Sequence, residues 1–259
     1  MENLSSTSRS GLGRNGLRLW GLLFLLAGMV GRSIFQMKLL GIGQISGGDL
    51  LTLMQNSDDA MIFATVALIL QAVETCATPI FAFLLIDSFR RTSNFRNYLL
   101  KIAGVAVISE IPFNLAVSGK VLDTSSRNPV VGMVFGLVML YLFRYFSEDS
   151  VRQRIIKLLV GIAGILWATM LRVDNGIPLM VMICILWAFR KNPLTRNIAG
   201  ATAAVVCTLV SPFYLASPMA MLVVHFYNEE KEYRRSQVVV YLAYPVMVLA
   251  VALAAMFAF

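Results

Sequence analysis

Residues 98–118 read YLLKIAGVAVISEIPFNLAVS, an apolar run with a carboxylate, Glu110, two residues before Pro112. A helix of about 20 mostly apolar residues is long enough to cross the hydrocarbon core of a bilayer. A charged side chain near the centre of such a helix costs at least roughly 3 kcal/mol on insertion scales, so it is usually kept because it faces a partner, a cavity or a substrate. The run therefore predicts a membrane span, and Glu110 is a functional lead.

Apolar runs of similar length recur along the chain, in which 58% of the residues are hydrophobic and 14% are charged. They lack the alternation of barrel strands, and in hydrocarbon only helices or closed barrels satisfy the backbone. The polar linkers are too short for a separate soluble domain. We therefore predict an all-α polytopic membrane protein, with a basic tail over 1–18 and a single transmembrane bundle over 19–259. The predicted spans number about nine and cover 19–41, 60–88, 98–118, 129–146, 155–172, 176–190, 197–211, 212–228 and 237–258.

The net charge of +8 has an explanation in this topology. Lys and Arg residues of membrane proteins concentrate in cytoplasmic loops. A cytoplasmic N-terminus and alternating spans place almost all the basic clusters on one side and the C-terminus outside. The lipid bilayer is therefore the predicted partner, and nucleic acid is not needed to explain the charge. The clusters are Arg9, Arg14 and Arg18; Arg90, Arg91 and Arg96; Arg144, Arg152 and Arg154; Arg190, Lys191 and Arg196; and Lys231, Arg234 and Arg235.

The same topology sorts the polar residues inside the spans by depth. An arginine with several carboxylates in the outer half is either a neutralised structural network or the lining of a polar cavity that opens outward. Glu110 and Glu74 lie deepest, and burial can make a carboxylate a proton acceptor near neutral pH. The outer half holds Arg32, Glu74, Glu110, Asn114, Asn128, Arg172 and Asp174, and the inner half holds Asp87, Lys101 and His225.

Two inner residues and the cysteines have simpler interpretations. Asp87 comes just before Arg90 and Arg91, which predicts a local ion pair at the level of the lipid headgroups. His225 is the single histidine and titrates near neutrality, so it is either an interfacial anchor or a catalytic base. The three cysteines lie in apolar runs without paired spacing, which indicates neither a disulfide framework nor a metal site.

Several motifs resemble those of the TraX family, in the same order and with fitting spacing from about residue 60 onward. Residues 79–85 read PIFAFLL, as in the family signature, and Arg-Thr-Ser-Asn follows them. Residues 108–116, ISEIPFNLA, together with Asn128, resemble the family's ISQIPF…LN block. Three further matches follow: Asp174 to Gly176 resembles its DYG turn, Tyr227 and Asn228 its LLYNG loop, and Tyr241 to Pro245 its final YLFYP span.

The resemblance implies an integral protein of the bacterial inner (plasma) membrane, similar to the conjugation protein that N-acetylates F-pilin. It implies an acyltransferase that takes an acetyl group from a cytoplasmic donor such as acetyl-CoA. The acceptor would be a pilin-like peptide N-terminus or a surface molecule. Arg90, Arg91 and Arg96 would hold the donor phosphates, because guanidinium groups bind phosphate through paired hydrogen bonds.

The chain departs from the family at two places. Gly31 and Arg32 stand where family members often carry an Asp-His pair in the first span, and Met247 stands where a histidine often follows the final Tyr-Pro. Amide formation needs a base to take the proton of the amine. Three residues then remain for this catalytic role, Glu110, Glu74 and His225.

Two other classes of function stay open at this point. One is a catalytically degenerate member of the family, which keeps the fold and acts as a membrane partner in a pilus, conjugation or secretion complex. The other is a small-solute carrier that uses the cavity around Glu74 and Glu110. The missing histidines favour the first of these alternatives, and the lack of a convincing inverted repeat weakens the second.

Overall fold

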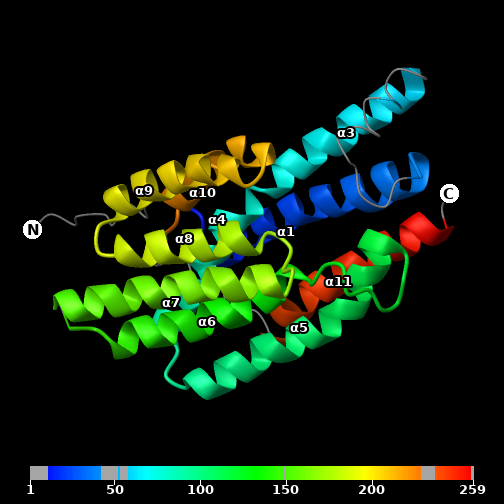
Figure 1. Ribbon diagram of the computed structural model, residues 1–259. Helices are drawn as coiled ribbons and strands as arrows, with labels where there is room; N and C mark the ends of the chain where they lie inside the picture. Colours follow the sequence, from blue (N-terminus) through cyan, green and yellow to red (C-terminus); the bar gives the residue numbers. More distant parts are fainter. Residues whose placement is uncertain (1–10, 42–51, 53–57, 149, 229–236, 258–259) are drawn as a thin grey trace, which may run out of the picture.

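A computed structural model shows the chain as a bundle of α-helices (Figure 1), which confirms the predicted all-α class. The described residues are 11–41, 52, 58–148, 150–228 and 237–257. The helices are α1 (Arg14–Val30), α3 (Asp58–Glu74), α4 (Ala77–Arg91), α5 (Phe95–Ser118), α6 (Pro129–Tyr145), α7 (Val151–Met170), α8 (Gly176–Ala188), α9 (Pro193–Val206), α10 (Met219–His225) and α11 (Gln237–Phe257). Three segments of other helix types are the π-helical η1 (Gly31–Leu39), which continues α1, and the 3₁₀ turns η2 (Cys207–Leu209) and η3 (Pro212–Leu215).

Capping residues fix the start and the end of several helices. Asn128 and Asn192 each accept hydrogen bonds from backbone N–H groups in the first turn of α6 and α9. In both helices a proline follows the cap, at a position where its missing N–H is not needed. α5 ends at Gly119, whose φ of 68° is the left-handed conformation that glycine adopts readily. These local signals explain why the loops interrupt the apolar runs where they do.

The predicted span 60–88 is one apolar run in the sequence but two helices in the structure. α3 ends at Glu74, and α4 begins three residues later. Pro79 has no N–H, so the carbonyl group of Thr75 lacks its usual partner four residues ahead. This carbonyl oxygen accepts a hydrogen bond from Ser217 Oγ at 3.1 Å. The break places Glu74 at a helix end inside the bundle, where it is 3% exposed.

The predicted span 212–228 also differs from a single continuous helix. It contains η3 and α10, and α10 has 7 residues. Pro212 is the first residue of η3, and Pro218 precedes the first residue of α10, because proline cannot donate to a preceding helical turn. At 1.5 Å per residue α10 is about 10 Å long, which is well short of the hydrocarbon core.

Several helices suit a bilayer by their length and composition. α7 carries exposed apolar side chains along its length, among them Leu158, Leu166 and Trp167, which is a surface for lipid rather than for water. The number of crossings and the orientation of the two ends stay predictions. Four helical stretches are long and apolar enough to cross a membrane, Arg14–Leu39, Asp58–Arg91, Phe95–Ser118 and Val151–Met170. Shorter apolar helices are Pro129–Tyr145, Gly176–Ala188 and Tyr241–Phe257.

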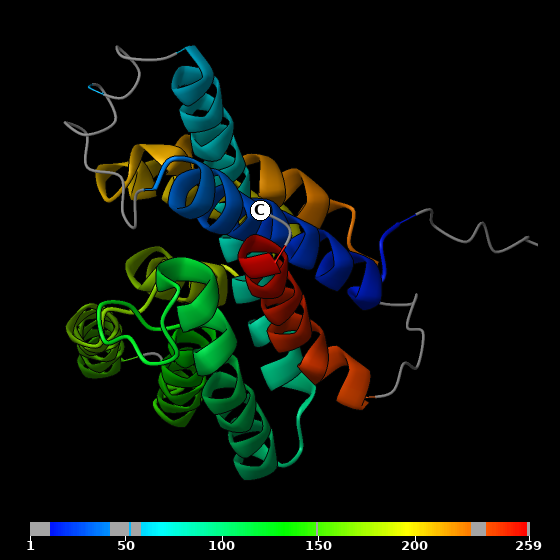
Figure 2. The same cartoon turned by 90° about the vertical axis from the view of Figure 1, so that its right-hand side faces the viewer.

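The centre of the bundle is formed by α4 and α8. α4 packs against α1, α8 and α10, and α8 packs against α6, α7 and α9. Ile80, Met180 and Ile183 are fully buried in this core. α11 packs along α5 and contacts α1, and Figure 2 shows it between these two helices. The first and the last of the described helices are therefore neighbours in the bundle.

Residues of four predicted cytoplasmic clusters gather at one end of the bundle. Arg14 at the start of α1 and Arg91 at the end of α4 both bind Asp87, at 2.9 and 3.2 Å. This confirms the predicted local pair of Asp87 with a neighbouring arginine. On α6, Arg144 lies 4.6 Å from the centre of the Phe89 ring. Three further arginines line a small recess beside Asp87, and these are Arg90, Arg190 and Arg196.

Candidate functional site

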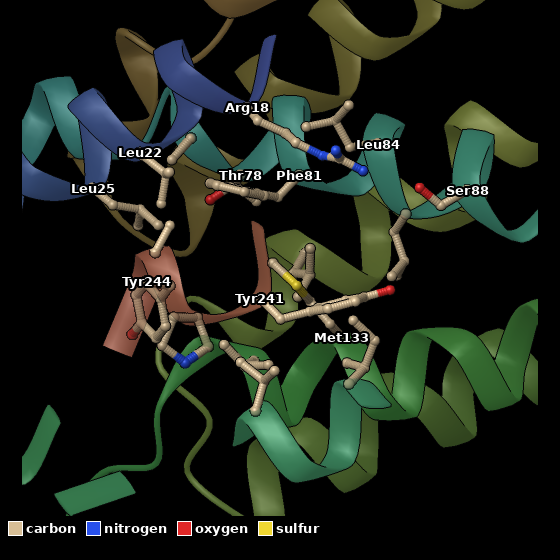
Figure 3. Close-up of a pocket in the computed structure, with 18 of the residues that line it drawn as sticks. Arg18, Leu22, Leu25, Thr78, Phe81, Leu84, Ser88, Met133, Tyr241 and Tyr244 are labelled. Atoms are coloured by element: carbon tan, nitrogen blue, oxygen red, sulfur yellow. The ribbon is translucent and has the colours of Figure 1, made fainter. Parts of the chain in front are cut away.

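A cavity of about 710 Å³ lies between α1, α4, α5, α6 and α11 (Figure 3). This volume is within the range of small-molecule and cofactor sites. Apolar side chains line its middle, and Figure 3 shows Leu22, Leu25, Phe81, Leu84 and Met133 among them. The charged residues of the lining lie near the two ends of α4, so the cavity has two polar ends joined by an apolar middle.

The basic end of the cavity is formed by Arg14, Arg18 and Arg91. Asp87 binds both Arg14 and Arg91, so two guanidinium groups share one carboxylate. Arg18 Nη1 donates to Asn15 Oδ1 at 3.2 Å, and among the described residues no carboxylate pairs with Arg18. Figure 3 shows the Arg18 guanidinium pointing toward Leu84 and Ser88. Asp87 does not line the cavity, so the described lining at this end holds three guanidinium groups and no carboxylate.

The three arginines predicted to hold donor phosphates are not together in the structure. Arg91 lines the basic end, and Arg90 lies in the separate recess beside Asp87. Arg96 is exposed in the first turn of α5 and does not line the cavity. Arg14 and Arg18 take the remaining places at the basic end. The sequence marks both as part of a basic cluster, but it does not show which arginines face inward.

The acidic end of the cavity is formed by Glu74, Asp174, Asn175 and Tyr244. Glu74 comes from the end of α3, and Asp174 and Asn175 come from the turn between α7 and α8. Arg32 of η1 holds both carboxylates, because its Nη2 binds Glu74 Oε1 and its Nη1 lies 3.0 Å from Asp174 Oδ2. One guanidinium therefore serves two carboxylates, which leaves an excess of negative charge at this end.

Hydrogen bonds behind the cavity hold the acidic end in place. Tyr214 is 2% exposed, and its hydroxyl donates to Asn175 Oδ1 at 2.7 Å. The same hydroxyl lies 3.2 Å from Thr78 Oγ1 on α4. Thr75 Oγ1, in the break between α3 and α4, donates to the Phe213 carbonyl oxygen at 3.1 Å. The turn before α8 and the break after α3 are therefore tied to the same segment, η3.

Gly28 of α1 leaves the space that the Glu74 carboxylate occupies. A Cβ atom at position 28 would lie 1.9 Å from Glu74 Oε2 and 2.4 Å from Glu74 Cβ, distances at which one group must move. α1 can pack this closely on the end of α3 because glycine has no side chain. The sequence of α1 is therefore matched to the position of Glu74.

Glu110 belongs to a second polar cluster outside the cavity. Its Oε1 lies 2.8 Å from Arg127 Nη1, and its Oε2 accepts a hydrogen bond from Asn128 Nδ2. Asn128 Nδ2 also donates to the Ala106 carbonyl oxygen at 2.9 Å, while Asn128 Oδ1 caps α6. We call Glu110, Arg127 and Asn128 the loop cluster, because they hold the 119–128 loop against α5. The sequence places Glu110 and Glu74 at similar depth, but the structure does not bring them into one site.

The other predicted site residues have structural surroundings. Asn114 is 2% exposed and donates to the Val121 carbonyl oxygen at 3.4 Å, so it anchors the same loop. Arg172 is exposed, and its carbonyl oxygen accepts from Arg127 N–H at 2.9 Å. His225 is exposed at the end of α10, with its Nδ1 3.2 Å from Asn197 Nδ2. None of the three lines the cavity. Of the three predicted catalytic residues, Glu74 alone does.

Sequence reasoning missed several residues of the cavity, and Tyr244 is the most informative of them. It is 7% exposed, and its hydroxyl has no hydrogen-bond partner among the described residues. Tyr241 and Tyr244 lie three positions apart, a spacing that puts both side chains on one face of a helix. Both belong to the segment from Tyr241 to Pro245 that resembles the family's final span, so a signal was present. Asn175 lies in the turn that resembles DYG and Arg18 lies in a basic cluster, but neither pattern shows that the side chain faces inward.

Comparison with known proteins identifies the family. No curated protein and no solved structure matches the chain. A family model described as TraX protein matches residues 50–254, which is more than half of the sequence. The match includes Glu74, Asp174 and Tyr244, together with most of the apolar helices. The chain is therefore a multi-pass membrane protein that belongs to the TraX family.

Proposed function

We propose that the protein is a membrane-embedded acyltransferase that takes an acetyl group from acetyl-CoA. The observation that supports this most directly is the single cavity that joins a basic end to a buried acidic end. The basic end suits the phosphates of the donor, and the acidic end offers a proton acceptor. The catalytic role of Glu74 and the donor-binding role of Arg14, Arg18 and Arg91 are parts of this proposal.

The length of the cavity suits a linear thioester donor. Along α4 the lining runs from Ala77 to Arg91, which is about 20 Å at 1.5 Å per residue. Coenzyme A carries its thiol at the tip of an extended pantetheine arm, far from its phosphates. With the phosphates at the arginines, the arm would lie in the apolar middle and the acyl group would lie beside Glu74. The two charged ends of the cavity are thus separated in the way that the phosphates and the thioester of the donor are separated.

The acceptor in this proposal is an amine or a hydroxyl group, as in a pilin-like peptide N-terminus or a surface molecule. Its nitrogen or oxygen attacks the thioester carbonyl carbon, the new bond forms and the carbon–sulfur bond breaks. The proton of the nucleophile passes to Glu74 and from there to the leaving thiolate of coenzyme A. Arg32 binds Oε1 of Glu74, so the proton would go to Oε2, which lies against Gly28 of α1.

The orientation of the chain is also part of the proposal. Lys and Arg residues favour the cytoplasmic side, and the basic end of the cavity lies at the end of the bundle where the predicted cytoplasmic arginines meet. A donor made in the cytoplasm would then enter at this end. The membrane is the inner membrane of a bacterium, with the N-terminus inside and the C-terminus outside. Reporter fusions after α6 and α11 would test this arrangement.

Binding of radiolabelled acetyl-CoA to the full chain in detergent tests the proposal. The wild type should show saturable binding, and Arg18→Gln should weaken it by roughly tenfold to a hundredfold, because a hydrogen bond to a charged group is lost. Arg96→Gln is the matched control, since Arg96 is a basic residue outside the cavity. Absence of saturable binding, or an equal loss in both variants, would overturn the proposal.

A degenerate, non-enzymatic member remains the second candidate. Arg32 supports it, because this residue stands where the family's histidine is expected and it engages both carboxylates of the acidic end. In that case the protein would act as a membrane partner in a pilus, conjugation or secretion complex. Acetyl transfer to a synthetic pilin-like peptide by the purified chain would exclude this candidate. Binding of such a peptide without transfer would favour it.

A further inference from the structure

The Tyr244 hydroxyl differs from the hydroxyls of Tyr214 and Tyr227, which both have protein partners. The Tyr214 hydroxyl donates to Asn175, and the Tyr227 hydroxyl donates to Asp87 at 3.1 Å. Tyr244 is 7% exposed and lines the cavity, but its hydroxyl has no protein partner among the described residues. A buried tyrosine hydroxyl normally finds a partner, because leaving it unpaired destabilises the fold. This hydroxyl is therefore available to a ligand.

The position of Tyr244 restricts the chemistry of that ligand. Figure 3 shows Tyr244 beside Leu25, at the opposite end of the drawn cavity from Ser88. Glu74, Asp174 and Asn175 line the same end. An anionic group here would be repelled by the two carboxylates, which share a single arginine. A neutral hydrogen-bond acceptor, such as a carbonyl oxygen, can receive the Tyr244 hydrogen without that repulsion.

We infer that Tyr244 forms a carbonyl-binding subsite, in which its hydroxyl donates a hydrogen bond to the acyl carbonyl oxygen of the donor. This inference rests on the proposed function and assigns one further residue to it. When the nucleophile adds to the carbonyl carbon, its proton passes to Glu74 and neutralises that carboxylate while the carbonyl oxygen gains negative charge. A hydrogen bond already aimed at that oxygen then becomes stronger. The bond returns to its initial strength when the carbon–sulfur bond breaks and the carbonyl group forms again. No proton leaves Tyr244 in the cycle.

The difference in affinity between acetyl-CoA and coenzyme A isolates this contact, because coenzyme A lacks the acyl carbonyl. Calorimetry on the full chain in detergent should show that the wild type binds acetyl-CoA about tenfold more tightly than coenzyme A. Tyr244→Phe should bring the two affinities close together and leave the affinity for coenzyme A unchanged. Tyr145→Phe, which removes a hydroxyl from a 72% exposed residue outside the cavity, should keep the wild-type difference.

Stability supplies a second measurement that does not depend on turnover. Because no described residue bonds the Tyr244 hydroxyl, Tyr244→Phe should leave the melting temperature equal to that of the wild type or above it. The rate of a single round of transfer should fall by about a hundredfold to a thousandfold, as for other donors to a developing oxyanion. A clear drop in melting temperature, or an unchanged preference for acetyl-CoA in Tyr244→Phe, would overturn the subsite while the proposed function stands. If the wild type binds neither ligand, the proposed function fails and the subsite fails with it.

Discussion

The acidic end of the cavity and the loop cluster contain the same kinds of group in different settings. Each combines a carboxylate, an arginine and an asparagine. Glu110 is paired one to one with Arg127, and Asn128 caps a helix while it binds Glu110. At the acidic end two carboxylates share Arg32, and the same wall holds the Tyr244 hydroxyl, which has no hydrogen-bond partner in the described part of the chain. A neutralised cluster holds a fold together, whereas an unbalanced one that lines a cavity is suited to chemistry.

Among the variants considered, replacement of Arg32 should cause the largest loss of stability. In Arg32→Gln both Glu74 and Asp174 stay in the bundle without their cation, and breaking a buried pair in this way costs about 3–5 kcal/mol. Unfolding by a graded denaturing detergent would measure the loss. The double variant Arg32→Gln with Glu74→Gln should recover part of it, because a single unpaired carboxylate remains. A single variant as stable as the wild type would show that the pair is not part of the folded core.

Changing each of the two glutamates to glutamine should have opposite effects on activity and stability. Glu74→Gln leaves Arg32 and Asp174 as a balanced pair, so stability should hardly change, while acetyl transfer should fall by at least about a hundredfold if Glu74 is the base. Glu110→Gln should keep the transfer rate and lose about 1 kcal/mol of stability, since Arg127 is 38% exposed and reaches water. Rates and unfolding curves measured on the same preparations would test both statements. If Glu110→Gln abolished transfer and Glu74→Gln did not, the catalytic base would belong to the loop cluster.

Asn128 gives a smaller, purely structural effect. Asn128→Ala removes the cap of α6 and the bonds to Glu110 and Ala106, and loss of a cap costs about 1 kcal/mol. Thermal unfolding should report this loss without a change in the affinity for acetyl-CoA. Asn192→Ala, at the cap of α9, is a control for a cap that has no glutamate beside it. A lowered affinity in Asn128→Ala alone would connect the loop cluster to the cavity.

The smallest effect concerns the pH dependence of the loop that carries Arg127. Asp123 accepts a hydrogen bond from Ser125 N–H at 2.9 Å, and this bond holds the pKa of its carboxyl group at about 2, below the ordinary value of 3.8. The lowered pKa means that the contact is fully present above about pH 4 and is lost as the pH falls through about 2. The Ser125 amide resonance, followed by NMR, should shift only in this window. Asp123→Asn should abolish the shift, and a midpoint near 4 would contradict the assignment.

The fold could largely be predicted from the sequence, and the site could be predicted only in part. The length and apolarity of the runs predicted the helices, whereas the asparagine caps were found in the structure. At the break after Glu74, the Thr75 carbonyl oxygen accepts hydrogen bonds from Thr78 N–H and from Ser217, and Ser217 is far away in the sequence. Glu74 and Glu110 look alike because depth is a property of the chain order, whereas pairing with Arg32 or Arg127 depends on how the helices are turned. For the same reason the sequence could not show that Arg18 faces the cavity.

The uneven charge of the basic end has a kinetic consequence. An anion that approaches Arg14, Arg18 and Arg91 feels their field only within a screening distance, which is about 10 Å at 0.1 M ionic strength. Capture of a phosphorylated donor should therefore slow as salt is added, whereas its escape from the low-dielectric interior should depend on salt far less. The time that a donor spends in the cavity and the frequency with which it arrives are thus set by different parts of the molecule.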